Sequence, residues 1–234
     1  MHSLLGIVLG LFLVFRTNSA YDRWWEGRKI WGSFVNNSRN LALKINAYLD
    51  RNNSVSRQWF SQMIICFVYS VKHHLRHGVQ ASSLDVDEST RAQLKAARHV
   101  PNFVLSLLYN RTNELYKDQT ISGDQLIILD KELKEFTDVL GGCERIKNTP
   151  IPYSYTMFIK KFIFIYLITL PFAFVTTSGY LTIPIVVVIT YVLLSVELIA
   201  EEIEDPFGGD INDLPMDDLA AKIKDNVKEL LLRI

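Results

Sequence analysis

The chain has 234 residues, and 25 basic side chains balance 25 acidic ones. This neutral balance excludes the basic surface that marks a nucleic-acid-binding protein, and two distant cysteines, Cys66 and Cys143, exclude a disulfide framework. A hydrophobic content of 49% with a mean hydropathy of +0.13 predicts a protein that is partly in a membrane and partly in water.

The first stretch, Ser3 to Trp25, is typical of a membrane-crossing helix that ends at a water interface. Ser3–Phe15 is uncharged and mostly apolar, Arg16 then meets water, and Trp24–Trp25 stand near the boundary, where tryptophans gather. As a helix, Ser3–Phe15 covers only about 20 Å, against about 30 Å of hydrocarbon. We therefore expect the chain to begin inside a spanning helix. It lacks the basic start and the cleavage site of a secretory signal.

One face of this helix carries Ile7, Leu11 and Phe15, which repeat every four residues. Two interpretations of this row stay open. In the first, the row faces lipid or a neighbouring helix, and the small pair Gly6 and Gly10 allows close helix packing. In the second, copies of the helix surround an axis, and the row forms stacked hydrophobic rings that gate a pore by dewetting.

Residues 26–150 have the periodicity of amphipathic helices, without an alternating strand pattern. We therefore expect an all-helical domain in water. The expected helices are Glu26–Asp50, Val55–His77, Ala92–Val100 ended by Pro101, Phe103–Tyr116, and Gln125–Leu140 closed by Gly141–Gly142.

Two long apolar runs follow Pro150–Pro152 and predict a transmembrane hairpin. They are Tyr155–Val175, with lysines only near its start, and Tyr180–Ile199, with Glu197 near its end. Lys160–Lys161 mark the cytoplasmic side, because basic residues are retained there.

An acidic, glycine-containing loop follows the hairpin, and an amphipathic tail helix ends the chain. Asp205, Asp210, Asn212 and Asp213 supply hard oxygen atoms at spacings that suit Ca²⁺. The alternative is a solvated acidic turn that caps the next helix. The chain thus divides into a transmembrane helix with its cytosolic exit (1–25), a helical cytosolic domain (26–150), a transmembrane hairpin (151–200), and the acidic loop with a C-terminal helix (201–234).

Two further groups of residues have open interpretations. His73, His74 and His77 resemble a metal cluster, but no neighbouring cysteine or carboxylate in the sequence completes it, so an exposed helix end is the alternative. Arg23, Trp24 and Trp25 are either an interfacial anchor or a packing element between subunits.

Three stretches, taken together, resemble the bestrophin family, in particular its bacterial members. They are FRTNSAYDRWWEGRKIWG (Phe15–Gly32), CERIKNTPIPYSYT (Cys143–Thr156) and IEDPFGGDINDLP (Ile203–Pro215). They occur in the family's order and at similar distances, and the resemblance covers essentially the whole chain. Family members carry one more transmembrane helix before the first one seen here, so we expect this chain to lack that segment.

The resemblance implies an all-α homopentameric ion channel in the bacterial inner membrane, with its helical domain in the cytoplasm. Its partners would be copies of itself, small monovalent ions such as chloride, and the lipid bilayer. Ile7, Leu11 and Phe15 match the family's apolar pore neck, and a second constriction is expected near Asp124–Ile127. The row carries no charge and leaves the choice between anions and cations open.

Animal members of the family that this chain resembles bind Ca²⁺ with a clasp around the same loop. Asp205, Asp210 and Asp213 occupy the matching positions here. Gly209, Ile211 and Asn212 stand where the animal loop is acidic. We therefore expect no required cofactor, with calcium binding as the alternative.

The favoured function is passive ion conduction, and the alternative is a membrane-tethered scaffold or binding protein. We do not expect an enzyme, because no glycine-rich phosphate loop, HExxH, GxSxG or acid–base pair appears.

Overall fold

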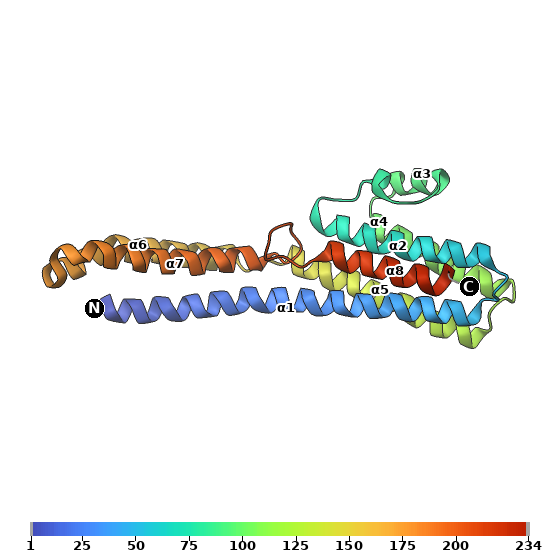
Figure 1. Ribbon diagram of the computed structural model, residues 1–234, viewed down its shortest axis with the longest axis horizontal. Coiled ribbons are helices and arrows are strands. Elements are labelled where there is room, and N and C mark those ends of the chain that lie inside the picture. Colours follow the sequence, from blue (N-terminus) through green and yellow to red (C-terminus); the bar gives the residue numbers. More distant parts are fainter. Residues whose placement is uncertain (1, 233–234) are drawn as a thin grey trace. The chain divides into compact units, whose positions relative to one another are not determined.

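The computed structural model describes residues 2–232, and the regular structure in that range is entirely helical (Figure 1). This confirms the expected all-α fold. The α-helices are α1 (His2–Tyr48), α2 (Ser54–Arg76), α3 (Glu88–Ala96), α4 (Val100–Lys117), α5 (Gly123–Asn148), α6 (Tyr153–Ser178), α7 (Thr182–Glu204) and α8 (Met216–Leu232), with short 3-10 helices η1 (Ala81–Ser83) and η2 (Gly179–Leu181).

The chain forms two compact units that share α1. The hairpin unit contains the residues up to Glu26 together with Ile146–Leu214, and the bundle unit contains Gly27–Arg145 and the residues from Pro215 onward. The sequence suggested separate helices before and after residue 25, but α1 continues unbroken through that point. No proline or glycine pair interrupts it there, so nothing in the local sequence forces a break.

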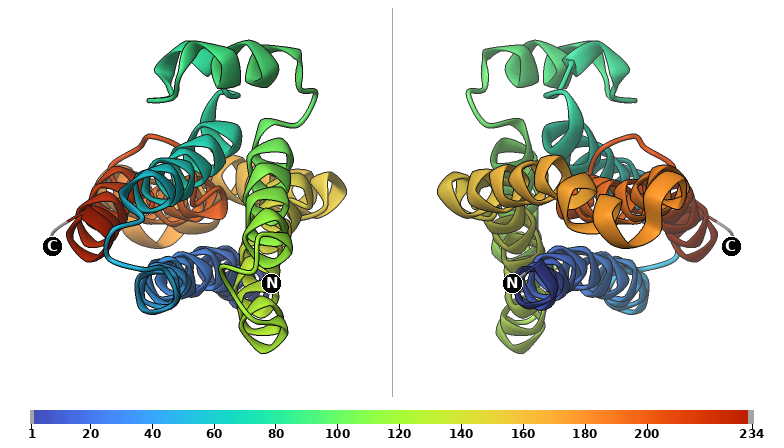
Figure 2. Two further views of the ribbon diagram at one scale, coloured as in Figure 1. Left: turned by 90° about the vertical axis from the view of Figure 1, so that its right-hand side faces the viewer. Right: turned by 90° about the vertical axis from the view of Figure 1, so that its left-hand side faces the viewer.

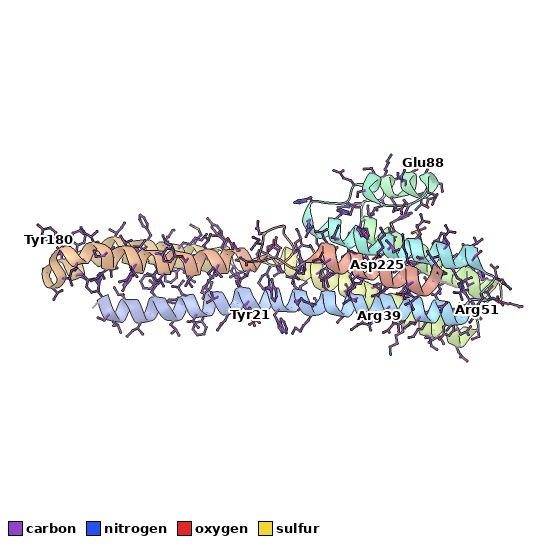
Figure 3. The ribbon with its side chains drawn as sticks, viewed as in Figure 1. Tyr21, Arg39, Arg51, Glu88, Tyr180 and Asp225 are labelled. Atoms are coloured by element: carbon purple, nitrogen blue, oxygen red, sulfur yellow. The ribbon has the colours of Figure 1, made fainter. Side chains whose placement is uncertain are left out.

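The hairpin unit is built on α6 and α7, which lie side by side (Figure 1). Gly179 turns the chain between them with a φ of +52°, in the left-handed region that glycine adopts at little cost. Tyr180, labelled in Figure 3, lies at this turn and is 94% exposed. Leu9 and Leu13 of α1 pack against α6 and form a buried apolar core with it.

The outer surface of α6 and α7 is strongly apolar. Phe172, Val187 and Tyr191 are each more than half exposed. By length and composition, two helical stretches of the described chain are able to cross a membrane, one within α1 and one covering α6 to α7. Such a surface suits lipid, because exposed apolar area of this extent is unfavourable in water.

The bundle unit has an aromatic core. Phe34 of α1, Phe67 of α2 and Phe136 of α5 are fully buried and in mutual ring contact. Helix α2 packs against both α8 and α4, and the left view of Figure 2 shows it between them. The amphipathic patterns of this region therefore meet around one core, as their periodicity predicted.

Two expected helix ends inside the bundle unit are wrong. Pro101 does not end a helix but lies in the first turn of α4, where its missing N–H costs nothing. Gly141 and Gly142 do not close α5, which continues to Asn148. At Gly142 an added Cβ would come within 2.9 Å of Ile30 Cδ1 of α1, so this glycine permits a close helix contact.

Candidate functional site

The row Ile7, Leu11 and Phe15 lies on the open face of the first half of α1. These side chains are 71%, 56% and 54% exposed, whereas Leu9 and Leu13 are buried against α6. An exposed apolar row of this kind is typical of a surface that contacts lipid or another protein. Within the hairpin unit, it is available to lipid, to a second copy or to a pore axis.

The two small residues beside the row have different surroundings. A Cβ added at Gly6 would lie 2.8 Å from the Tyr166 hydroxyl of α6, while one at Gly10 would meet nothing within 4 Å. Gly6 therefore serves the contact between α1 and α6. At Gly10 the backbone of α1 is open to contact from outside the helix.

Arg16 does not meet water as the sequence suggested. It is fully buried, and its Nη2 lies 2.7 Å from Glu204 Oε2, with Glu197 Oε1 at 3.8 Å from its Nε. Two carboxylates of α7 thus face one guanidinium of α1. A buried arginine requires such partners, because an unpaired buried charge is very costly.

Arg23 binds the carboxyl ends of two helices. Its guanidinium donates to the carbonyl oxygens of Ile146 (2.6 Å) and Thr149 at the end of α5, and to that of Glu204 (3.0 Å), the last residue of α7. The last carbonyls of a helix have no intrahelical partner and carry partial negative charge, so a cation there is stabilising. Arg23 therefore packs the hairpin unit together.

The two tryptophans after Arg23 form a small aromatic stack with Tyr21. Trp24 Nε1 donates to the carbonyl oxygen of Asn212 (2.9 Å) in the acidic loop, while Trp25 stays 46% exposed. Trp24 thus anchors the acidic loop to α1, and the indole ring of Trp25 stays partly exposed.

Within residues 2–232, the candidate calcium ligands Asp205, Asp210 and Asp213 do not gather their carboxylates into one group. Asp205 Oδ1 accepts from the Phe207 N–H (3.2 Å), and Asp213 Oδ2 accepts from the Asp210 N–H (2.6 Å). These bonds shape the loop from within. Gly208 leaves room for the Asp213 carboxylate, since a Cβ there would lie 2.6 Å from Asp213 Oδ2.

A different group of potential metal ligands forms in the bundle unit. His74 of α2 meets His99, which precedes α4, and Glu144 of α5. The sequence singled out His74 but joined it to His73 and His77, which are not in this group. His99 and Glu144 lie far from His74 along the chain, and no local spacing marks them as its partners.

Comparisons with known proteins place these features in a family. The sequence profile described as Bacterial/Fungal Bestrophin protein matches residues 1–229. A protein of Nostoc sp. named voltage-dependent anion channel-forming protein is 38% identical over 230 residues, which are 96% of this chain and 75% of that protein. One of the same name from Escherichia coli K12 is 34% identical and matches 95% of this chain and 73% of its own.

The solved structures agree with the sequence relatives. A bacterial bestrophin homologue from Klebsiella pneumoniae superposes with a TM-score of 0.94 at 32% identity, covering 98% of this chain and 86% of that one. A structure described as a membrane protein, with the substitution G264A, gives a TM-score of 0.94 at 31% identity. The chain spans about three quarters of the length of the two sequence relatives named above. On sequence and structure alike, the chain belongs to the bacterial and fungal bestrophin family.

Proposed function

We propose that copies of this chain form a bestrophin-type channel that conducts small anions passively across the bacterial inner membrane. The names of the relatives from Nostoc and Escherichia coli support the choice of anions. The membrane-compatible surface of α6 and α7 supports the location.

The observation that carries the proposal is the exposed row Ile7, Leu11 and Phe15. In a homopentamer with cyclic symmetry, one helix face suffices to make each ring of a central pore. Five copies of α1 would then set three apolar rings along the axis, one helical turn apart. The row would gain the cover that a single chain does not give it.

The mechanism that follows is gating by dewetting of the apolar neck. Apolar rings in a narrow neck expel water, and an ion then cannot pass until the neck widens or wets. Residues Asp124–Ile127, at the start of α5, are the candidate second constriction, and Ile127 is 69% exposed. This mechanism requires no cofactor.

The proposal is tested by chloride flux in liposomes that carry the purified chain, with Na⁺ and K⁺ gradients measured separately. We expect chloride flux, and we expect Leu11→Ala to increase it because the smaller side chain widens and wets the ring. The matched control is Leu194→Ala on α7, which makes the same truncation at a half-exposed site outside the row.

Two results would count against the channel. Equal flux from the wild type, Leu11→Ala and Leu194→Ala would show that Leu11 does not line the narrow part of a pore. Absence of flux, with a particle mass in detergent that does not correspond to five copies, would leave a membrane-tethered scaffold as the function.

A further inference from the structure

His74 of α2, His99 at the N-cap of α4 and Glu144 of α5 converge in the bundle unit. The Nε2 atoms of both histidines lie 2.8 Å from the same Glu144 Oε1. The two imidazole rings lie with centroids 4.7 Å apart. The three side chains are each between a quarter and a third exposed, so an ion in solution can reach them.

The hydrogen bonds define the proton arrangement of the metal-free cluster. His99 Nδ1 accepts the Asn102 N–H (3.3 Å) as the cap of α4, so the proton of a neutral His99 ring is on Nε2 and is donated to Glu144. His74 reaches the same oxygen through its own Nε2. One carboxylate oxygen thus holds together two rings whose Nε2 atoms become metal ligands when the proton is absent.

The spacing fits a small tetrahedral ion after a minor adjustment. Ligand atoms about 2.0–2.1 Å from zinc at tetrahedral angles are about 3.3 Å apart. The two N···O separations are 2.8 Å, and all three donor atoms lie within 4.8 Å of one another. An ion would separate the carboxylate from the rings by about half an ångström, which side-chain rotation alone can supply.

We propose that His74, His99 and Glu144 bind one Zn²⁺-like transition-metal ion, with water in the fourth position. Two imidazoles and one carboxylate favour zinc and its neighbours over Ca²⁺ and Mg²⁺, which prefer oxygen ligands alone. Binding moves the Nε2 proton of each neutral ring to its Nδ1, and at His99 this exchanges the long Asn102 cap bond for a metal bond. The site belongs to the bundle unit and uses no residue of the row on α1, so this proposal does not depend on the channel proposal.

The consequence is a link between α2, α4 and α5. A ligand that binds the folded chain and not the unfolded one shifts the folding equilibrium toward the folded state. Zinc should therefore raise the unfolding temperature of the bundle unit, whether or not the protein conducts ions.

The test uses the purified, tag-free chain in detergent, after removal of metal with a chelator. Calorimetry with Zn²⁺ should show one ion per chain, and Co²⁺ should give the strong visible absorption of a four-coordinate site. His74→Gln, His99→Gln and Glu144→Gln should each weaken binding at least about tenfold, because losing even a residue that only hydrogen-bonds to a metal ligand costs about 10–100-fold.

The matched control is His77→Gln, which changes an exposed histidine at the end of the same helix as His74. It should leave zinc affinity, the Co²⁺ spectrum and the zinc-induced thermal shift unchanged. Loss of binding in His73→Gln and His77→Gln, with His99→Gln unaffected, would place the ion on α2 alone and overturn the proposal. So would the absence of saturable zinc binding by a wild-type chain whose circular dichroism shows it to be folded.

Discussion

Arginine side chains donate hydrogen bonds to the last carbonyl oxygens of several helices in this chain. Arg57 donates to the carbonyl oxygens of Asn46 and Leu49 at the end of α1, both at 2.9 Å, as Arg23 does for α5 and α7. The guanidinium suits this task because its several N–H groups reach several carbonyls at once. Sequence reasoning recognised Arg23 as a boundary residue but not its partners, because Ile146 and Glu204 lie far from it along the chain.

Arg23→Ala should destabilise the protein by about 2 kcal/mol or more, since it removes three charged hydrogen bonds and leaves helix-end carbonyls without them. Arg23→Lys should recover only part of the loss, because an ammonium group lacks the planar fork. Thermal unfolding of the purified protein in detergent measures both. Arg39→Ala on the same helix is the control, and an equal loss in that variant would contradict the capping role.

The spacing of single residues in the sequence predicted the row on α1 but not what surrounds it. Spacing of four places Ile7, Leu11 and Phe15 on one face whatever they contact, and the structure leaves that face open. Arg16 shows the limit. Its charge suggested water, but its partners on α7 are more than 180 residues away in sequence and bury it completely.

At the scale of elements, the glycine pair of α5 allows a matched comparison. An alanine in place of an exposed helical glycine stabilises a helix by about 0.5–1 kcal/mol. Gly141→Ala should gain this amount, because a Cβ there meets nothing within 4 Å. Gly142→Ala should gain less or lose stability, because Ile30 Cδ1 must move from 2.9 Å. Unfolding free energies in urea compare the two, and a larger gain at Gly142 would refute the close contact.

Helices α2 and α8 are joined by ion pairs that depend on pH. Lys72 and Arg76 donate to Asp217 at 2.8 and 2.7 Å, and these bonds lower the pKa of Asp217 to about 2. The unfolded carboxyl has a pKa of about 3.9. The pair therefore stabilises the fold above about pH 4 and loses its effect as pH falls toward 2. Asp217 is more than half exposed, so we expect no more than about 1 kcal/mol.

Asp217→Asn should accordingly reduce stability at neutral pH and make it less sensitive to acid between about pH 4 and pH 2. Unfolding midpoints across this range measure the effect. Asp218→Asn is the control, because Asp218 is also exposed and in the first turn of α8, where either carboxylate favours the helix dipole. Identical pH profiles for the two variants would show that the dipole, and not the pairs with α2, is responsible.

Element types were predictable from sequence where the signal was long, and element ends were not. The uncharged runs around Pro171 and Pro184 predicted the hairpin, and α6 and α7 confirm it. The expected end of α5 was wrong because the local cost of a helical glycine, about 1 kcal/mol, yields to packing. The expected boundary at Pro101 was wrong because a proline is equally compatible with the first turn of a helix. The His74 cluster was beyond sequence reasoning for a related reason. Its other members come from the segment before α4 and from α5, and no periodicity relates positions 99 and 144 to position 74.

At the scale of the whole molecule, family membership agrees with a membrane protein that is not an enzyme. The paired spans then predict a topology. Two consecutive spans place their joined end on the side of the membrane opposite to their free ends. Lys160 pairs with Glu201 at 2.8 Å near the free ends. Because basic residues are retained on the cytoplasmic side, we expect Lys160 and Lys161 to place these ends there. The turn at Tyr180 should therefore face the periplasm, and the bundle unit should lie in the cytoplasm.

Single cysteines test this arrangement with a membrane-impermeant maleimide in cells whose outer membrane is permeable. Tyr180→Cys should react in intact cells, and Glu88→Cys, exposed on α3 (Figure 3), should react only after the inner membrane is opened. The native thiols add little background, because burial raises the pKa values of Cys66 and Cys143 to about 12 and a thiolate is needed for reaction. The unsubstituted chain measures that background directly. Labelling of Glu88→Cys in intact cells would mean that the true topology is the reverse of the one inferred here. Labelling of neither variant before the inner membrane is opened would mean that α6 and α7 do not cross the membrane as a pair.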